Sequence, residues 1–226
     1  MLVALTRERG RNDALARLVA SRAETVEVPL TRTEYRDVAQ VAADALALDG
    51  APFRALVVTS SRALAYLDAV SPVLDAAAAI YSVGPATSAG LGAAGRAVRY
   101  QSSGTALDLA PHLEEESVLI LGARGGREEL RDVLVAQGRR CELLGCYETL
   151  EVDLDEEDRA LLGRCDAVFI GAPSAWRAAR EWLREDVWVI VPGTTTAEAV
   201  RADGRRAVVG WGDDFDAAWA HVVGEI

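Results

Sequence analysis

Two segments with one shared pattern decide the fold: RALVVTSSRAL (54–64) and DAVFIGAPSAW (166–176). In each, a short apolar, β-branched run ends in a turn of small residues that leads into a helical stretch. This order of strand, turn and helix is the repeating unit of a parallel α/β sheet. Two further pairs match: GPATSAGLGAAG (84–95) with GTTTAEAVRADG (193–204), and LVALTRERGR (2–11) with VLILGARGGR (118–127). The sequence therefore predicts an internal duplication.

Strand-like runs alternate with alanine- and leucine-rich helical stretches along the whole chain. The expected strands are 2–5, 25–30, 55–59, 80–83, 97–100, 118–121, 141–149, 167–170, 187–191 and 207–209. One open sheet of ten strands would be at the limit that sheet twist allows. We therefore expect an α/β fold of two flavodoxin-like, doubly wound parallel-sheet lobes.

Composition narrows the chemistry. The 226 residues include no lysine, which excludes a Schiff-base lysine, pyridoxal phosphate and a P-loop. A net charge of −11 without any basic run argues against nucleic-acid binding. His112 and His221 stand in helix-like surroundings and are interpreted as structural.

The cysteines and the N-terminus exclude further classes. Cys141, Cys146 and Cys165 have the spacing of neither a disulfide framework nor a zinc site, so we expect buried free thiols and no metal. Charge follows the first five residues, and no apolar run approaches the roughly 20 residues of a membrane helix. We expect a cytoplasmic protein without a membrane partner.

GLGAAG (90–95) has the letters of a dinucleotide-binding fingerprint. The duplication pairs Gly90 with Ala199 and Gly92 with Arg201, so these glycines are not features of the repeated element. We expect them inside a helix, with Gly95 at its C-terminal cap. No nucleotide cofactor is predicted.

The turns after the strands are rich in small and hydroxyl residues: TSS (59–61), GPAT (84–87), GAPS (171–174) and GTTT (193–196). One interpretation is that serine and threonine only cap helices. The other adds anion binding, because helix N-termini at the carboxyl ends of parallel strands present free N–H groups. Two facing lobes would offer four such turns to a polyanionic ligand.

The order and spacing of these segments resemble the uroporphyrinogen-III synthase family over nearly the whole chain. The motifs are VALTRERGRNDALARL, VEVPL, VVTSSRA, SVGPATSAGL, RGGREELRDVL, CYETL, DAVFIGAPSA and PGTTTAEAV. The resemblance implies one lobe of residues 1–30 plus 150–226 and a second lobe of residues 33–146. It also implies a two-stranded antiparallel linker of residues about 28–33 and 146–150.

The linker agrees with the residues themselves. The runs 25–33 and 141–152 are longer than usual strands, and nine extended residues reach roughly 30 Å. Pro29 is tolerated on an edge, where its missing N–H is not needed. Two ordinary interior strands are the alternative.

The resemblance implies a reaction in porphyrin and heme biosynthesis. Linear hydroxymethylbilane loses its terminal hydroxyl as water and closes to uroporphyrinogen III with ring D inverted. The lyase needs no cofactor, because a pyrrole nitrogen can expel the hydroxyl, and orientation decides the isomer. Tyr147 is the expected proton donor, since a phenol stays protonated at neutral pH. The expected substrate-binding residues are Arg7, Thr59, Ser60, Ser61, Arg62, Gly84, Thr87, Ser174, Gly193, Thr195 and Thr196.

Three segments depart from the family's pattern. Gly171 and Ala172 stand where the family often has threonine and serine, Thr194 replaces a usual proline, and GARGGREE changes the surroundings of Arg124 and Arg127. A non-enzymatic two-lobed binder of a polyanionic small molecule is the alternative function. In either case we expect a monomer.

Overall fold

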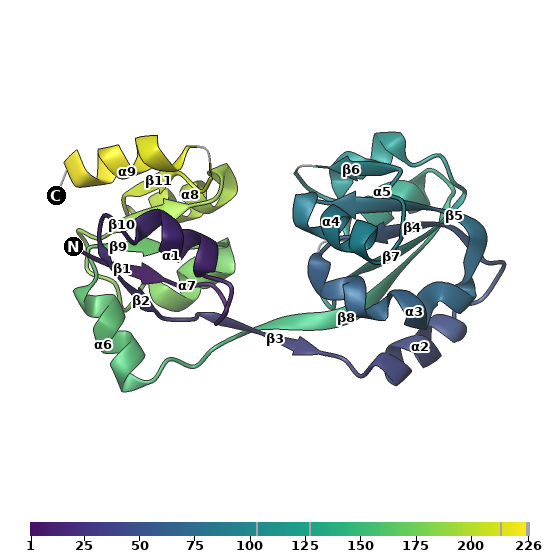
Figure 1. Ribbon diagram of the computed structural model, residues 1–226, viewed down its shortest axis with the longest axis horizontal. Helices are drawn as coiled ribbons and strands as arrows, with labels where there is room; N and C mark the ends of the chain where they lie inside the picture. The colour runs from purple at the N-terminus through teal and green to yellow at the C-terminus, as the bar shows by residue number, and fades with distance from the viewer. Residues whose placement is uncertain (103, 127, 213, 225–226) are drawn as a thin grey trace. The chain divides into compact units, whose positions relative to one another are not determined.

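The computed structural model describes residues 1–102, 104–126, 128–212 and 214–224. The chain divides into two compact units (Figure 1). Unit 1 comprises Met1–Thr33 and Thr149–Ile226, and unit 2 comprises Glu34–Glu148. Among the described residues, no helix is both long and apolar enough to cross a membrane.

Unit 1 is built on a five-stranded parallel sheet with the order β11-β10-β9-β1-β2. Its strands are β1 (Leu2–Leu5), β2 (Glu24–Glu27), β9 (Ala167–Phe169), β10 (Trp188–Val191) and β11 (Ala207–Val209). Its helices are α1 (Asp13–Val19), α6 (Glu156–Arg164), α7 (Pro173–Ala179), α8 (Thr194–Ala202) and α9 (Phe215–Gly224). Helices follow β1, β9, β10 and β11, as parallel crossovers require.

Unit 2 contains a sheet with the order β3-β8-β7-β4-β5-β6. The strands of this sheet are β3 (Thr31–Tyr35), β4 (Phe53–Val58), β5 (Leu74–Val83), β6 (Tyr100–Ser102), β7 (Ser117–Ala123) and β8 (Arg140–Glu151). Of these, β3 begins and β8 ends in unit 1. Its helices are α2 (Val38–Leu46), α3 (Leu67–Val70), α4 (Pro85–Ala93) and α5 (Glu129–Ala136), with 3-10 turns η1 (Ser61–Tyr66), η2 (Ser71–Val73) and η3 (Leu107–His112). The α/β class with parallel sheets is thus confirmed.

The two sheets share one spatial plan. β4 and β9, which carry the two segments of the strongest sequence match, each lie at the centre of their sheet. β5 and β10 flank them on one side, and β7 and β1 on the other, as the two further matches require. Only the chain order differs: numbered along the chain, the parallel strands run 2-1-3-4-5 in unit 1, which is flavodoxin-like, and 3-2-1-4-5 in unit 2. The strands β1, β2, β9, β10 and β11 of unit 1 correspond in place to β7, β8, β4, β5 and β6 of unit 2, so the connectivity of one unit is a circular permutation of the other.

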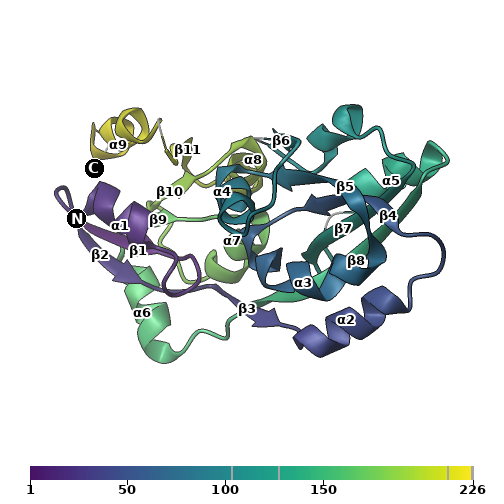
Figure 2. The same cartoon turned by 45° about the vertical axis from the view of Figure 1, so that its right-hand side comes forward.

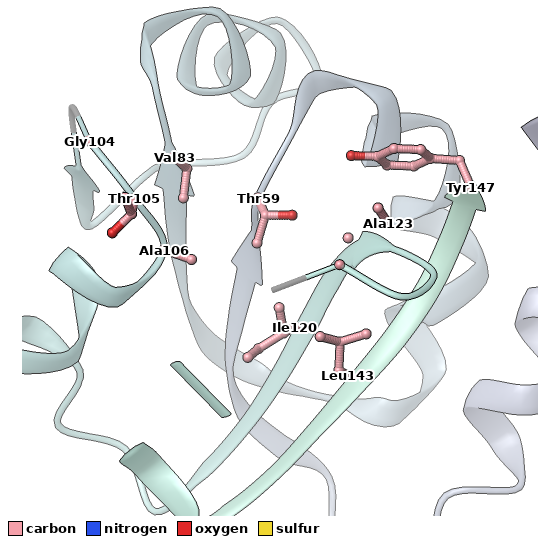
Figure 3. A pocket seen from close by; sticks show the side chains of 11 residues that line it. Thr59, Val83, Gly104, Thr105, Ala106, Ile120, Ala123, Leu143 and Tyr147 are labelled. Atoms are coloured by element: carbon pink, nitrogen blue, oxygen red, sulfur yellow. The ribbon is translucent and has the colours of Figure 1, made fainter. Parts of the chain in front are cut away.

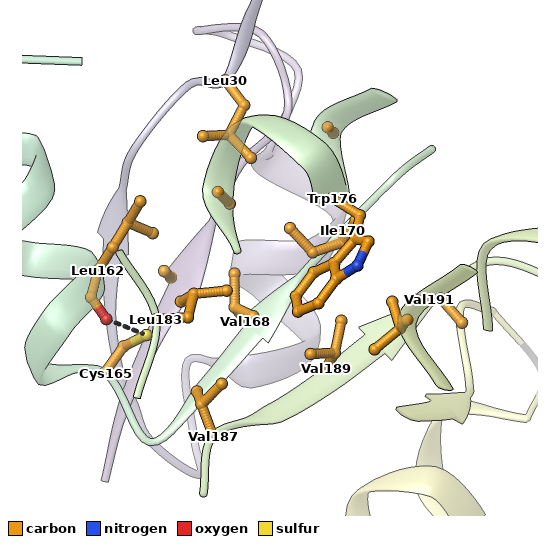
Figure 4. Packing of buried hydrophobic residues seen from close by; sticks show 14 of the residues in the cluster. Leu30, Leu162, Cys165, Val168, Ile170, Trp176, Leu183, Val187, Val189 and Val191 are labelled. Atoms are coloured by element: carbon orange, nitrogen blue, oxygen red, sulfur yellow. Dashed lines mark hydrogen bonds between the residues drawn. The ribbon is translucent and has the colours of Figure 1, made fainter. Parts of the chain in front are cut away.

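Both faces of each sheet are buried, which explains the near-continuous apolar strands. In unit 1, Val168, Ile170 and Val189 pack with Trp176 of α7 on one face (Figure 4). Phe169 and Ile190 point to the other face, against α1 and α9. In unit 2, one face packs on η1, α3 and α4, and the other on η3 and α5.

Residues 25–33, expected as one extended run, form two strands. β2 pairs with β1, whereas β3 is the hydrogen-bonded neighbour of β8 (Figure 2). The break falls at Pro29, which lacks an N–H, between the fully buried Val28 and Leu30. The β3–β8 pairing is antiparallel, because the carbonyl of Leu30 accepts from residue 152 and the N–H of Arg36 donates back to residue 146.

The GLGAAG letters lie in α4 and just beyond it, as expected. Gly95 has φ +71°, the left-handed conformation of a residue that follows a helix. Gly90 has a packing role, since a Cβ there would stand 2.3 Å from Leu64 Cδ1 of η1. These glycines shape a helix and its packing, and they do not form a strand-to-helix turn.

Candidate functional site

The carboxyl ends of the unit 2 strands surround a cavity of about 220 Å³ (Figure 3). It is lined by Thr59, Val83, Gly104, Thr105, Ala106, Ile120, Gly122, Ala123, Gly126, Leu143 and Tyr147. Thr59 follows β4, Val83 ends β5, Ala123 ends β7, and Leu143 and Tyr147 belong to β8. In open parallel sheets this edge is where ligands bind. The cavity wall is mostly apolar, with hydroxyl groups at Thr59, Thr105 and Tyr147.

An irregularity in β8 directs Tyr147 into this site. Gly122 pairs with Gly145, but the next residue, Ala123, pairs with Tyr147, so Cys146 is an extra residue on β8. Successive side chains of a regular strand point to opposite faces. Here Cys146 and Tyr147 both contact the same core cluster. Such bulges redirect side chains, often beside active sites.

The Tyr147 ring is buried, at 6% exposure, and held by two neighbours. The Arg62 guanidinium carbon lies 5.7 Å from its centroid, and the Tyr35 ring centroid lies 6.3 Å away. Figure 3 shows its hydroxyl directed across the mouth of the cavity, toward the side of Thr59. Among the described residues, no group hydrogen-bonds to this hydroxyl.

The other two buried tyrosines of unit 2 are used differently. The Tyr66 hydroxyl donates to the carbonyl of Arg36 at 2.7 Å. The Tyr81 hydroxyl contacts the carbonyl of His112 at 3.1 Å and the Glu115 carboxylate at 3.0 Å. Burial, and secondarily Glu115, raises the pKa of Tyr81 to about 12. Both phenols are therefore committed to structural bonds, which distinguishes them from Tyr147.

Thr59 is fixed at the cavity by its own strand end. Its N–H and its hydroxyl both donate to the carbonyl of Leu121, each at 3.0 Å. Gly122 provides the space for this arrangement, because a Cβ there would stand 2.7 Å from Thr59 Oγ1. The hydroxyl also has acceptor lone pairs that remain available to a ligand.

The remaining expected residues of unit 2 are dispersed. The Ser60 hydroxyl accepts from the Arg62 N–H at 3.3 Å as the cap of η1, and Ser61 begins that turn half-buried. Gly84, at φ +77°, precedes α4, and its N–H donates to the carbonyl of Ser102 at 2.8 Å. Thr87 is buried inside α4 and does not line the cavity. Of these four residues, Ser60 caps the start of η1, which is one of the two roles that the sequence suggested for the serines and threonines of these turns.

Unit 1 has its own hollow, of about 380 Å³, at the carboxyl ends of its strands. It is lined by Arg7, Gly171, Pro192 and Trp211, which follow β1, β9, β10 and β11. The Arg7 guanidinium carbon lies 5.8 Å from the Trp211 ring centroid. Arg7 is the one expected binding residue in this lining.

The other expected residues of unit 1 lie at two helix starts. Ser174 is the second residue of α7 and is half-buried. Gly193 precedes α8 and Thr195 is exposed in its first turn, whereas Thr196 is buried. No side chain caps α8 among the described residues.

Cys141, Cys146 and Cys165 are buried free thiols, as expected. Burial raises their pKa values to about 11, 12 and 11. Such thiols are protonated at neutral pH and poor nucleophiles.

Sequence reasoning missed several lining residues. Trp211 follows a predicted strand between two glycines, and an aromatic residue at a strand's carboxyl end is a usable signal. Thr105 and Ala106 belong to the loop after β6, which carries no distinct pattern. Arg124 is exposed, and its N–H donates to the carbonyl of Tyr147 at 2.6 Å. Arg127 lies outside the described residues.

Comparisons with known proteins give one consistent family. Structures that resemble this chain include a mutant uroporphyrinogen III synthase from Thermus thermophilus, with a TM-score of 0.67, 20% identity and 100% of both chains covered. The uroporphyrinogen-III synthetase from Helicobacter pylori has a TM-score of 0.64 and 20% identity, with 99% of this chain and 98% of that chain covered. No curated protein matches by sequence. The family model described as uroporphyrinogen-III synthase HemD matches residues 13–210. This chain therefore belongs to the uroporphyrinogen-III synthase family.

Proposed function

We propose that this chain is the lyase that converts hydroxymethylbilane to uroporphyrinogen III and water, with inversion of ring D. The observation that carries the proposal is family membership over residues 13–210. The net charge of −11 argues against a nucleic acid as a further partner of the chain. We propose that the chain acts on this small molecule as a monomer.

We propose Tyr147 as the proton donor to the departing hydroxyl. Its support is geometric: a phenol held against Arg62 at 5.7 Å, at the cavity of unit 2, with no hydrogen-bond partner among the described residues. In the first step the substrate's C–O bond breaks. The pyrrole nitrogen supplies the electrons, the phenolic proton goes to the leaving hydroxyl, and water departs. The substituted carbon of the last ring attacks the resulting azafulvene and becomes a spiro centre. The bond from this carbon to its original methylene bridge then breaks, and that methylene bonds to the unsubstituted α-carbon of the same ring, which inverts the ring. The proton that this second carbon loses restores the pyrrole and returns to the phenolate of Tyr147.

We propose that the remaining groups act by positioning the substrate. Its eight carboxylates need donors, which the Thr59 loop, Arg62 and the exposed start of α8 supply in the two units. Holding the chain in one conformer is an orientation effect, and such effects reach several kcal/mol. Isomer III forms only if the last ring is presented with its substituted carbon to the azafulvene.

The test supplies freshly generated hydroxymethylbilane and separates the product isomers by chromatography. We expect isomer III in excess. An isomer ratio equal to that of spontaneous closure would reject the enzyme and leave the non-enzymatic binder. Tyr147→Phe should lower kcat on the order of 10²-fold with little change in KM. Tyr66→Phe, which removes a structural hydroxyl in the same unit, is the matched control. Equal turnover in the two variants would remove Tyr147 from the mechanism.

A further inference from the structure

The hollow of unit 1 has an aromatic wall that is not among the residues expected from the sequence. Trp211 is half-buried, and its indole stands next to Arg7, Gly171 and Pro192 around a volume of about 380 Å³. A tryptophan face beside an arginine binds planar and anionic groups, because the indole supplies a stacking surface and the guanidinium supplies paired donors. The hollow therefore combines the two features that a flat carboxylate-bearing ring requires.

The indole is held in place from behind. Its ring centroid lies 5.9 Å from that of Phe169, tilted by 45°, which anchors it on the core of unit 1. A Cβ at Gly171 would stand 3.3 Å from Trp211 Cη2 and 3.5 Å from Cζ3. A larger side chain at position 171 would thus displace the ring. Gly171, where the family pattern often has a hydroxyl residue, provides the space for an aromatic wall here.

Arg7 gives the hollow its charge. Its guanidinium carbon lies 5.8 Å from the Trp211 centroid, close enough for the cation to interact with the ring. Arginine stays protonated at every physiological pH and binds carboxylates with two parallel N–H donors. In a chain of net charge −11, such a cation at a strand end marks a local site for an anion.

We propose that this hollow is a subsite for one carboxylate-bearing pyrrole ring, which stacks on Trp211 while a carboxylate of that ring pairs with Arg7. This inference rests on the proposed function for the identity of the ring. Gly171 is then a positioning residue, because its missing side chain leaves room for the indole at the end of β9. In this subsite, stacking on Trp211 and an ion pair with Arg7 take the place of the hydroxyl contacts that the family pattern often has at position 171.

The chain contains a matched control. Arg159 and Trp182 form a second arginine–tryptophan pair in unit 1, with the guanidinium carbon 4.5 Å from the ring centroid, and neither residue lines the hollow. Replacing Trp182 removes the same chemistry without touching the proposed subsite. Any general effect of losing a tryptophan from unit 1 appears in both variants.

The experiment measures KM and kcat for hydroxymethylbilane in Trp211→Leu, Trp211→Phe, Gly171→Ala and Trp182→Leu. We expect Trp211→Leu to raise KM about 5- to 30-fold, as the loss of one ring-stacking contact predicts. Trp211→Phe keeps an aromatic face and should restore most of the affinity. Gly171→Ala should raise KM by less, and Trp182→Leu should stay near wild type. Arg7→Gln, compared with Arg159→Gln, tests the charge in the same way.

A second measurement separates this inference from the proposed function. Porphobilinogen, a single pyrrole with two carboxylates, is titrated while tryptophan fluorescence is followed. We expect quenching that Trp211→Leu abolishes and Trp182→Leu retains. If the wild type makes no isomer III but this difference appears, the subsite stands and the synthase assignment fails. If isomer III forms and the two leucine variants have the same KM and quenching, the subsite is rejected. Thermal melts of each variant confirm folding, and Trp211→Phe decides the outcome should the leucine variant not fold.

Discussion

Gly122→Ala tests whether the cavity of unit 2 depends on a missing side chain. The new methyl would stand 2.7 Å from Thr59 Oγ1, whereas ordinary contact begins at 3.4 Å. The Thr59 hydroxyl must therefore move by roughly 0.7 Å, the difference between these two distances, or change rotamer, because the closely packed interior has no spare room. Its hydroxyl bond to Leu121, at 3.0 Å, would then be lost. That loss costs about 1 kcal/mol, and an off-rotamer side chain costs about 1 kcal/mol more. Burying one methyl returns about 0.8 kcal/mol. We expect unit 2 to be destabilised by about 1 kcal/mol.

The assay follows each unit separately during denaturation. All five tryptophans belong to unit 1, so their fluorescence follows that unit, while labelling of Cys141 and Cys146 follows unit 2. Gly92→Ala is the control, because nothing lies within 4 Å of its Cβ and alanine stabilises a helix by about 0.5–1 kcal/mol. Combining Gly122→Ala with Thr59→Ala should cost less than the two single changes together, because the methyl then occupies the vacated space. Strict additivity, or an unchanged midpoint for Gly122→Ala, would refute the steric reasoning.

Two further predictions concern titration. Burial raises the pKa to about 11 for Cys141 and Cys165 and to about 12 for Cys146. At pH 8 the first two thiols should react with a disulfide reagent roughly a hundredfold more slowly than free cysteine, and Cys146 roughly a thousandfold more slowly, whereas all three should react in denaturant. Fast labelling of the folded protein would contradict their burial. The pKa of Tyr81 is about 12 when folded against an unfolded value of 10.0, so its contribution to stability is complete below pH 10 and declines as the pH rises toward 12. Tyr81→Phe should therefore lose less stability across that interval, as measured by denaturant midpoints, and an identical pH dependence would show that Tyr81 is not responsible.

The fold could be predicted because its signals are local and repeated. Each buried strand is a short β-branched run, and both sheets use the same strand, turn and helix units. The similarity of the paired segments therefore predicted that they occupy equivalent places in the two sheets. The break at Pro29 was harder. Both Val28 and Leu30 are apolar, and the chain leaves one sheet for the other within three residues, which a pattern of hydrophobicity does not register. Pro29, which lacks an N–H, was the one residue in this run that indicated a break between two strands.

The candidate site was predicted less completely, because it depends on contacts that are remote in sequence. The side chain of Tyr147 lines the cavity of unit 2 because the register between β7 and β8 shifts by one residue. The sequence of β8 alone contains no feature that predicts this extra residue. Trp211 reaches the hollow of unit 1 because position 171, forty residues earlier, lacks a side chain. Thr87 shows the opposite difference: a hydroxyl residue after a glycine turn suggested a ligand contact, whereas its place in α4 buries it away from the lining of the cavity.

The shared plan of the two sheets makes the difference between their sites informative. Corresponding strand ends carry Thr59 after β4 and Gly171 after β9, so the same structural position has a hydroxyl side chain in unit 2 and no side chain in unit 1. That position in unit 2 is beside a phenol, and in unit 1 it is filled by an indole. Under the proposed function, the repeated scaffold would place the ligand-binding positions at the strand ends, and the residue at each position would decide which ligand group binds there. We therefore expect a substitution at Tyr147 to act mainly on kcat and those at Gly171 and Trp211 to act mainly on KM, a division that a single uniform binding surface would not produce.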